Sequence, residues 1–337
     1  MDSRKKPYAV IEGMIIAGYA INAQKGYLYI RNEYQKAIDC VRRAIEDCEQ
    51  AGILGKNVLG NEFSFECEII CAAGSYVCGE EGALMESLEG RTGVPRIKPP
   101  LPTVKGIMEQ PTIINNVETL ANIPLILKDG SEEYAKIGIE SCSGTKLISL
   151  AGAVKNKGLT EIPMGKITLR QLIYDIGGGI ENDHGLKCIQ TGGPSGGYIT
   201  EENLDLTLDF DSLKQSGSLL GSGGIVVIDD NICVVDMAKY MIEFLADESC
   251  GTCTPCREGL RCILEILTKI TNGKGSKEDL DLIKEIAFVA SKASRCALGM
   301  TIGNPILTTL KYFKDEYEEH IEKLRCPANV CAMIKED

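Results

Sequence analysis

The chain has 337 residues, with 48 aspartates and glutamates against 36 lysines and arginines, for a formal net charge of −12 at pH 7. This length exceeds one ordinary core and predicts two or three compact units. The acidic balance, with no basic run, argues against a nucleic-acid partner. No stretch reaches the roughly 18 to 20 apolar residues of a membrane span and no signal-peptide pattern opens the chain, so we expect a cytoplasmic protein without direct membrane insertion.

The first part of the chain alternates helical and strand patterns. A helical run around residues 10–15 precedes a strand at 27–30, an amphipathic helix at 34–51 and a second strand at 63–70. This alternation predicts an α/β domain with a mainly parallel sheet, for which we set the bounds 1–140.

Short strands and glycine-rich turns follow, with one short helical stretch near Leu172. This mixture predicts a small α+β unit of the β-grasp-like type over residues 141–235. The expected strands cover residues 146–151, 166–169, 187–191 and 224–229.

The last part, residues 236–337, is almost wholly helical in its pattern and predicts a bundle of about four helices. Ser276 with Asp279 forms a capping-box pattern, and Asn304 before Pro305 is typical of an N-cap followed by a first helical residue. The expected helices cover residues 237–247, 256–271, 277–292 and 304–325.

Fifteen cysteines are many for a protein of a reducing compartment, where they indicate metal ligands or buried thiols more often than disulfides. In the segment ESCGTCTPCREG, residues 248–259, three thiols recur at every third position. A [4Fe-4S] cluster takes three such thiolates from one tight loop and a fourth from a distant segment. The spacing therefore predicts a cluster on Cys250, Cys253 and Cys256, with Cys296, between two predicted helices, as the fourth ligand.

Other arrangements of the cysteines remain open. A zinc site on the same four residues is the alternative, although zinc sites more often pair two separated Cys-x-x-Cys units. The two histidines, His184 and His320, stand in different segments, which argues against a His-based zinc or catalytic site. Cys326 and Cys331 have a spacing compatible with a second ligand pair, or are buried thiols, whereas Cys262, inside a predicted helix, is interpreted as a core residue.

Three segments offer contacts for a nucleotide. The glycine-rich 74–82 joins a strand to a helix and carries Glu80 and Glu81, which are either ligands or ordinary first-turn charges. Lys98, in the proline-rich 95–102, either meets a phosphate or is solvated. Asn115 and Asn116 open another helix, as caps or as ligands.

Six ordered stretches resemble the NADH-binding flavoprotein subunit of respiratory complex I and of the related NAD(P)-linked, often electron-bifurcating, hydrogenases. They cover residues 74–90 (GSYVCGEEGALMESLEG), 95–102, 111–123 (PTIINNVETLANI), 190–197 (QTGGPSGG), 221–229 and 248–259. The resemblance implies a Rossmann-like flavin domain, a β-grasp unit and a helical bundle. It also implies NADH oxidation by FMN, a [4Fe-4S] cluster, a thioredoxin-like [2Fe-2S] partner subunit, and a larger iron–sulfur or hydrogenase subunit.

The resemblance also assigns residues. It places Gly79, Glu80, Asn115, Asn116 and Thr119 at FMN, and Glu81 and Lys98 at NADH, and its cluster ligands match Cys250, Cys253, Cys256 and Cys296. Leu101 stands where the family usually has an aromatic residue that stacks on the adenine. The family's glycine-rich flavin loop would precede the first helix, so the flavin domain is expected to lack it and the chain to be N-terminally truncated.

Two functions therefore follow as hypotheses. The first is an electron-transfer subunit that takes electrons from NADH through FMN to the cluster, as an NADH dehydrogenase. The second is a flavin-free electron relay or assembly subunit that keeps the cluster. An incomplete gene product is a third interpretation. The chain ends soon after Cys331, so further clusters are not expected.

Overall fold

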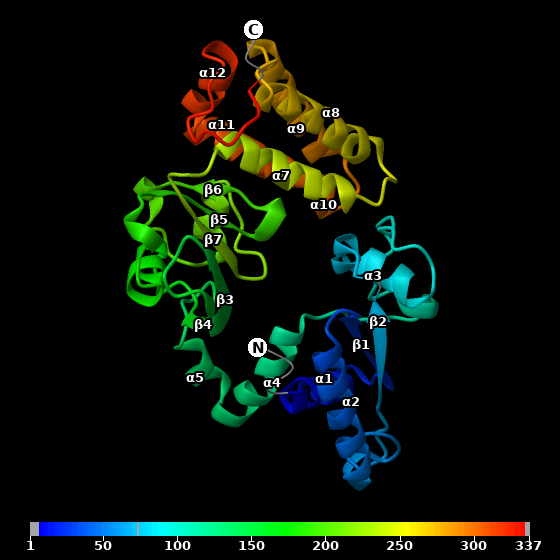
Figure 1. The fold of residues 1–337 in the computed structure, drawn as a ribbon. Helices are drawn as coiled ribbons and strands as arrows, with labels where there is room; N and C mark the ends of the chain where they lie inside the picture. The colour runs from blue at the N-terminus through cyan, green and yellow to red at the C-terminus, as the bar shows by residue number, and fades with distance from the viewer. Residues whose placement is uncertain (1–6, 73, 334–337) are drawn as a thin grey trace. The chain divides into compact units, whose positions relative to one another are not determined.

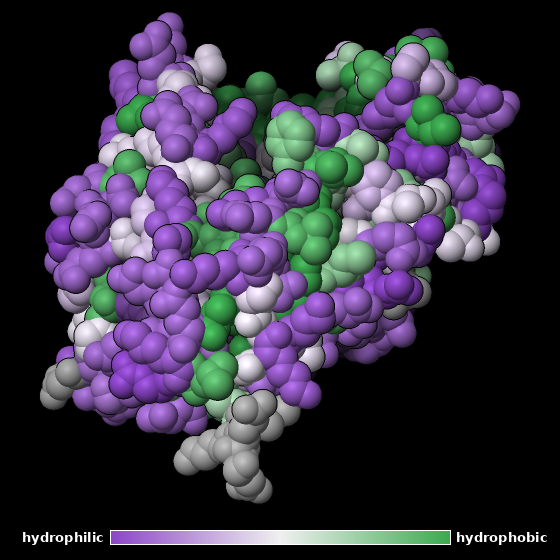
Figure 2. Space-filling model, turned by 90° about the horizontal axis from the view of Figure 1, so that it is seen from above, coloured by the Kyte–Doolittle hydropathy of each residue, from purple (hydrophilic) through white to green (hydrophobic). Residues whose placement is uncertain are grey.

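The computed structural model describes residues 7–72 and 74–333. The chain divides into two compact units, residues 1–134 and 135–337 (Figure 1). Within the described residues, no helix is both long enough and apolar enough to cross a membrane. Hydrophilic side chains cover most of the face shown in Figure 2, as the charge of −12 leads one to expect.

The first unit holds a two-stranded sheet whose strands run parallel. The pairing runs from Lys25 opposite Glu66 to Arg31 opposite Ala72, which confirms the predicted parallel arrangement. The elements are α1 (Pro7–Ile21), β1 (Lys25–Arg31), α2 (Gln35–Gln50), η1 (Val58–Gly60), β2 (Glu66–Ala72), η2 (Tyr76–Gly79), α3 (Glu81–Leu88), η3 (Ile107–Glu109), α4 (Val117–Asp129) and α5 (Ser131–Ala135).

The core of the first unit lies between the sheet and the helices α1, α2 and α4. Val10 and Ile11 of α1, Val41 of α2 and Leu28 of β1 are all buried there. Helices α1 and α4 approach closely because Gly13 has no side chain: a Cβ atom there would lie 1.9 Å from the carbonyl oxygen of Leu120. Any larger residue at position 13 would push the two helices apart.

The second unit contains a five-stranded mixed sheet in the order β4-β3-β7-β5-β6. Strands β3 and β7 are parallel, and the other neighbours are antiparallel. Its elements are β3 (Thr145–Gly152), β4 (Gly158–Pro163), η4 (Gln171–Ile176), η5 (Glu181–Asp183), β5 (Leu186–Thr191), η6 (Gly193–Ser195), β6 (Tyr198–Ile199), η7 (Glu201–Asn203), α6 (Phe210–Gln215) and β7 (Gly224–Asp229).

One predicted strand of this sheet is wrong. Residues 166–169 make only an isolated bridge, between Thr168 and Thr207, and then enter the short helix η4. Gly165 has a φ of 70° and turns the chain immediately before this segment. The apolar residues of 166–169 are therefore buried as the chain enters a helix and not as part of a strand. The strand at the edge is β4 instead, which the sequence hides because it is short and bounded by Gly158 and Pro163.

The C-terminal part of the second unit is helical, as predicted, but contains more helices than expected. The predicted helix 304–325 is two helices with a break at Phe313, whose φ of −131° is not helical. The helices are α7 (Val234–Asp247), α8 (Thr254–Thr271), α9 (Lys277–Ala293), α10 (Ala297–Met300), α11 (Gly303–Tyr312) and α12 (Lys314–Glu322).

Of the two helix caps that the sequence predicts in this part, one is present and one is not. The capping box of Ser276 and Asp279 is present at the start of α9, with both hydrogen bonds formed. Asn304, by contrast, is not an N-cap, because α11 already begins at Gly303. Its amide donates instead to the carbonyl oxygen of Ser195, 2.9 Å away, which ties α11 to the loop before β6.

Candidate cofactor and metal sites

The loop between α7 and α8 carries the three regularly spaced thiols. Cys253 is the N-cap of α8, and Pro255 lies in the first turn of that helix. Gly251 has a φ of 70°, a value that glycine adopts without strain, and its carbonyl oxygen accepts a hydrogen bond of 2.6 Å from Arg257. The loop is therefore a tight turn at a helix N-terminus, where the free N–H groups favour anionic ligands.

Cys296 lies beside this loop in the structure. It is the N-cap of the short helix α10, and one turn later Gly299 approaches Cys256 so closely that a Cβ atom on the glycine would lie 2.9 Å from the Cβ of Cys256. The tertiary packing thus brings the fourth predicted cysteine to the three-cysteine loop across some forty residues of chain.

The chemistry of these residues fits a [4Fe-4S] cluster. Burial, together with the nearby charges of Cys253, Cys296 and Cys250, raises the pKa of Cys256 to about 11. Four thiolates repel one another in this way unless a cationic centre compensates them. The hydroxyl of Ser294, which is buried and has no protein partner among the described residues, lies at the same packing contact and offers a donor to a sulfur atom.

The start of α3 holds the predicted nicotinamide-nucleotide residues. The carboxylate of Glu80 caps the helix by accepting from the backbone N–H of Ala83, 2.9 Å away. Lys98 pairs with this carboxylate at 3.2 Å and also contacts Glu81. The Glu81 hydrogen bond raises the pKa of Lys98, so the ammonium group stays charged at the helix N-terminus. The structure brings Glu80, Glu81 and Lys98 together. Glu80 is the N-cap of α3, one position before the first turn, and Glu81 is a first-turn residue.

The predicted flavin residues flank the same part of the first unit. Asn116 is the N-cap of α4, with its side-chain oxygen accepting from the N–H of Glu118 at 2.8 Å. Asn115 and Thr119 are exposed. Gly79 closes the short helix η2, and a Cβ atom there would meet nothing within 4 Å, which leaves open space for a ligand to approach the backbone.

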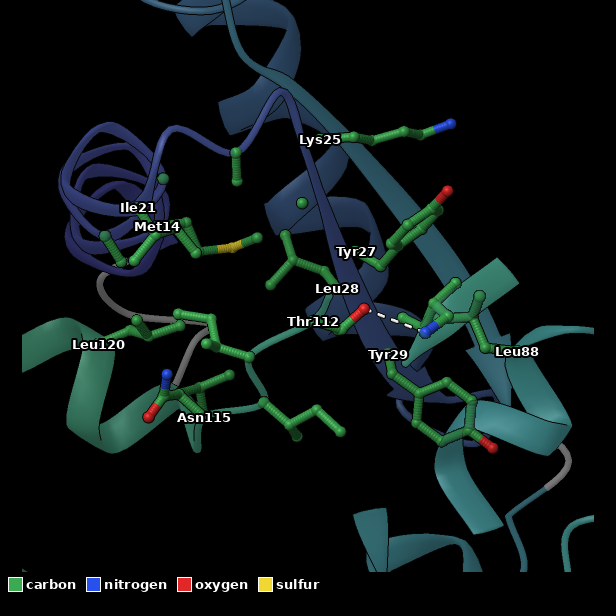
Figure 3. Close-up of a pocket in the computed structure, with 18 of the residues that line it drawn as sticks. Met14, Ile21, Lys25, Tyr27, Leu28, Tyr29, Leu88, Thr112, Asn115 and Leu120 are labelled. Atoms are coloured by element: carbon green, nitrogen blue, oxygen red, sulfur yellow. Dashed lines mark hydrogen bonds between the residues drawn. The ribbon is translucent and has the colours of Figure 1, made fainter. Parts of the chain in front are cut away.

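A cavity of about 190 Å³ lies between β1, α1 and the segment before α4. Figure 3 shows Met14, Leu28 and Leu120 around this hollow, with Asn115 at its border. Common small-molecule sites measure roughly 300 to 1,000 Å³. The cavity is mostly apolar and smaller than that range.

A network of arginines and glutamates supports the region after α3. Arg96 pairs with Glu86 and with Glu89, and it also donates to the carbonyl oxygen of Gly106 at 2.8 Å. Arg91 contacts the same two carboxylates. The network fixes the extended segment that carries Lys98, because Arg96 lies only two residues before it.

The Glu86 carboxylate in this network predicts a pH-dependent contribution to stability. The Arg91 hydrogen bond lowers the pKa of Glu86 from 4.5 to about 2, so the contribution is complete above pH 4.5 and is lost as the pH falls through 2. Glu86→Gln should therefore lower the free energy of unfolding by about 1 to 2 kcal/mol at pH 7 and have little effect near pH 2.

Urea unfolding followed by circular dichroism at several pH values measures this difference. The control is Glu46→Gln, which changes an exposed carboxylate on α2. A Glu86→Gln effect that is equal at neutral and acidic pH would contradict the assigned ion pairs.

Four further potential ligands meet inside the second unit: Cys233, His320, Cys326 and Cys331. The Nε2 atom of His320 lies 3.4 Å from the sulfur of Cys233 and 3.4 Å from that of Cys331, and the two sulfurs are 3.6 Å apart. The hydrogen bond from Cys331 lowers the pKa of Cys233.

From the sequence, His320 is expected to stand apart from other ligands, and Cys326 with Cys331 is either a second ligand pair or two buried thiols. The structure corrects the first point, because α12 carries His320 to the two thiols that follow it. The local signal was His-x5-Cys-x4-Cys at residues 320–331, but its fourth member, Cys233, is distant in the sequence. All fifteen cysteines, which lie within the described residues, are free thiols.

Two family models match the chain. One, the Nuo51 FMN-binding domain, matches residues 2–125, and the other, the NADH-ubiquinone oxidoreductase-F iron-sulfur binding region, matches residues 236–320. The second range contains Cys250, Cys253, Cys256 and Cys296 but not Cys233, Cys326 or Cys331.

Relatives match the chain along almost its whole length. The NADP-reducing hydrogenase subunit HndC of Solidesulfovibrio fructosivorans is 47% identical, over 97% of this chain and 67% of the relative. A second relative belongs to the NADH-quinone oxidoreductase of Rhizobium meliloti. It is the F 2 subunit of that enzyme and is 44% identical, over 96% of this chain and 76% of the relative.

A solved structure shares the fold. The crystal structure of an NAD+-reducing [NiFe]-hydrogenase in the H2-reduced state contains a chain that is 33% identical, with a TM-score of 0.85. The match covers 94% of this chain, which spans about half, 52%, of that solved chain. With an FMN-binding domain and a 4Fe-4S binding region in the expected order, the chain belongs to the family of NADH-binding flavoprotein subunits of complex I and NAD(P)-reducing hydrogenases.

Proposed function

We propose that this chain takes electrons from NADH through FMN to a [4Fe-4S] cluster held by Cys250, Cys253, Cys256 and Cys296, as one subunit of a larger redox complex. The observation that carries the proposal is the meeting of the three-cysteine loop with Cys296 at the contact between Gly299 and Cys256. When bound, FMN accepts a hydride and releases the two electrons singly, which matches it to a cluster that takes one electron at a time.

The residues of the loop hold and tune the cluster in this proposal. Because burial raises the pKa of Cys256 to about 11, iron binding must displace its proton, and assembly is favoured at higher pH. The N-terminus of α8 directs its free N–H groups towards the anionic sulfur atoms. The guanidinium of Arg257, held over the loop by the carbonyl oxygen of Gly251, adds positive charge beside them.

The residues at α3 and α4 bind and orient in this proposal. Lys98 offers its ammonium group to an NADH phosphate, and Glu81 is positioned to accept hydrogen bonds from the nucleotide. Gly79, Glu80, Asn115, Asn116 and Thr119 contact FMN. Gly79 leaves room for the ring and the exposed amide of Asn115 supplies both a donor and an acceptor.

The fold suits this assignment. The parallel pair β1 and β2 with its helices corresponds to the Rossmann-like flavin domain, and the mixed sheet to the β-grasp-like unit. In the complex, the partners are a thioredoxin-like [2Fe-2S] subunit, which receives the electrons, and a larger iron–sulfur or hydrogenase subunit.

One anaerobic preparation tests the proposal. The full chain, reconstituted with iron, sulfide and FMN, should contain about four iron atoms per chain and bound flavin, and NADH should drive ferricyanide reduction. Electron paramagnetic resonance of the reduced protein should show the cluster. A preparation that holds the cluster but neither binds flavin nor oxidises NADH would contradict the enzymatic part.

That second outcome describes the competing function, a flavin-free electron relay or assembly subunit. Three observations favour it: the cavity of about 190 Å³ is small for a flavin, the Glu80 carboxylate is occupied as a helix cap, and Leu101 stands in place of an aromatic residue. The ratio of flavin to iron in the same preparation distinguishes the two functions.

A further inference from the structure

We propose that Cys233, His320, Cys326 and Cys331 bind a single zinc ion, at a site separate from the iron–sulfur cluster. The four ligand atoms lie within 4.8 Å of one another. They come from three places in the second unit: the N-cap of α7, the last turn of α12 and the turn that follows α12.

The distances fit a tetrahedral ion. Zinc–sulfur bonds of about 2.3 Å and zinc–nitrogen bonds of about 2.0 Å place two sulfurs about 3.8 Å apart and a sulfur and a nitrogen about 3.5 Å apart. The corresponding distances here are 3.6 Å between Cys233 and Cys331 and 3.4 Å from either sulfur to His320. Three thiolates and one imidazole complete four-coordination, which leaves no open position and makes the site structural.

The surroundings orient the histidine as a ligand. Its Nδ1–H donates to the carbonyl oxygen of Glu316 at 2.6 Å, which orients the ring so that the Nε2 atom faces the thiols. The ring is fully buried, as is Tyr317, whose hydroxyl bonds Thr309 at 2.8 Å. A hydrogen bond from the second ring nitrogen to a backbone oxygen is the usual support of a metal-bound imidazole.

The fold also accommodates the charge of the site. Three thiolates and Zn²⁺ together carry one negative charge, and the N-terminus of α7 faces it, with the N–H of Asp236 donating to the sulfur of Cys233 at 3.5 Å. Beside it, the Glu316 carboxylate accepts from the N–H of Val234 at 3.2 Å and pairs with Lys187 of β5. The ligand-bearing helices are thus anchored to the sheet.

The backbone after α12 is bent to deliver the last two ligands. Leu324 has a φ of 48° and Asn329 a φ of 54°, so two residues other than glycine adopt the left-handed region within one short segment. Cys326 is 4% exposed and only Cys331 borders solvent, which gives the ion an entry path. Since α7 leads from Cys233 directly into the cluster loop, the ion holds the helix that carries the iron site.

Other interpretations of the four residues fit less well. A disulfide needs its sulfurs at about 2.05 Å, whereas those of Cys233 and Cys331 are 3.6 Å apart. A group of uncharged thiols would not require the oriented imidazole. The matched iron–sulfur region contains the four predicted cluster cysteines and His320, but it does not contain Cys233, Cys326 or Cys331. The family's iron–sulfur region therefore does not account for these three thiols.

Metal analysis of matched variants tests the site in the full chain. We compare the natural chain with Cys331→Ala, Cys296→Ala and the control Cys262→Ala, which removes a half-buried thiol of α8. The natural chain, purified anaerobically with zinc and iron both supplied, should hold about one zinc and about four iron atoms. Cys331→Ala should lose the zinc and keep the iron, Cys296→Ala should do the reverse, and Cys262→Ala should keep both.

The outcomes separate this site from the proposed function. Zinc that survives Cys331→Ala but disappears with Cys296→Ala would place it at the iron site and overturn the proposal. An iron-loaded natural chain without zinc, or a disulfide between Cys233 and Cys331 found by mass spectrometry, would overturn it equally. Should Cys331→Ala fail to fold, Co²⁺ loading of the natural chain replaces it, and only the absorption of a tetrahedral thiolate complex supports the site.

Discussion

Replacing Cys296 by alanine is expected to abolish the [4Fe-4S] cluster while leaving the second unit folded. A [4Fe-4S] cluster needs four thiolates, and in the proposed ligand set the fourth is that of Cys296 at the start of α10, beside the packing contact of Gly299 with Cys256. The iron content should fall from about four atoms per chain to less than about one. The cluster signal in electron paramagnetic resonance should vanish with it.

The control for this variant is Cys262→Ala. Both substitutions remove one half-buried thiol from the same helical region, but Cys262 lies inside α8, more than two helical turns after the N-cap Cys253. A Cys296→Ala protein with a full iron complement would remove Cys296 from the ligand set. Equal iron loss in both variants would mean that folding, and not ligation, limits cluster assembly.

Replacing Lys98 by alanine is expected to reduce kcat/KM for NADH by about tenfold to hundredfold, or about 1.4 to 2.7 kcal/mol. The ammonium group is held by Glu80 and Glu81. In the proposed function, its loss removes a charged contact to an NADH phosphate and leaves two carboxylates facing an anionic substrate. Most of the loss should fall on KM, because the contact acts on binding and not on the hydride transfer.

Lys105→Ala provides the matched control, because this exposed lysine pairs with Glu109 at 2.8 Å in the same segment of the first unit. Steady-state kinetics of NADH–ferricyanide turnover, with thermal unfolding of both variants, measures the effect. Equal kinetics in the two variants would restrict Lys98 to neutralising the start of α3. A lowered kcat at constant KM would place it at the chemical step.

The elements with long, regular patterns were predictable from the sequence. The helix α2 and the strands β1 and β2 lie within a few residues of the expected bounds, because each has a periodic apolar face that one core buries. The short edge strand β4 and the break at Phe313 were missed. Both depend on neighbours that are distant in the sequence, and a local pattern does not contain them.

The sequence by itself determined the family, the parallel sheet and the three-cysteine loop, because these depend on residues that are adjacent or regularly spaced. The sequence also named Cys296 as the fourth cysteine, and the fold places it beside the loop. Only the tertiary structure brought His320 to Cys233, which is 87 residues away in the sequence. A metal ligand is defined by a distance of a few ångströms in space. Chain separation says little about that distance until the helices have packed, so the second site became visible only in the fold.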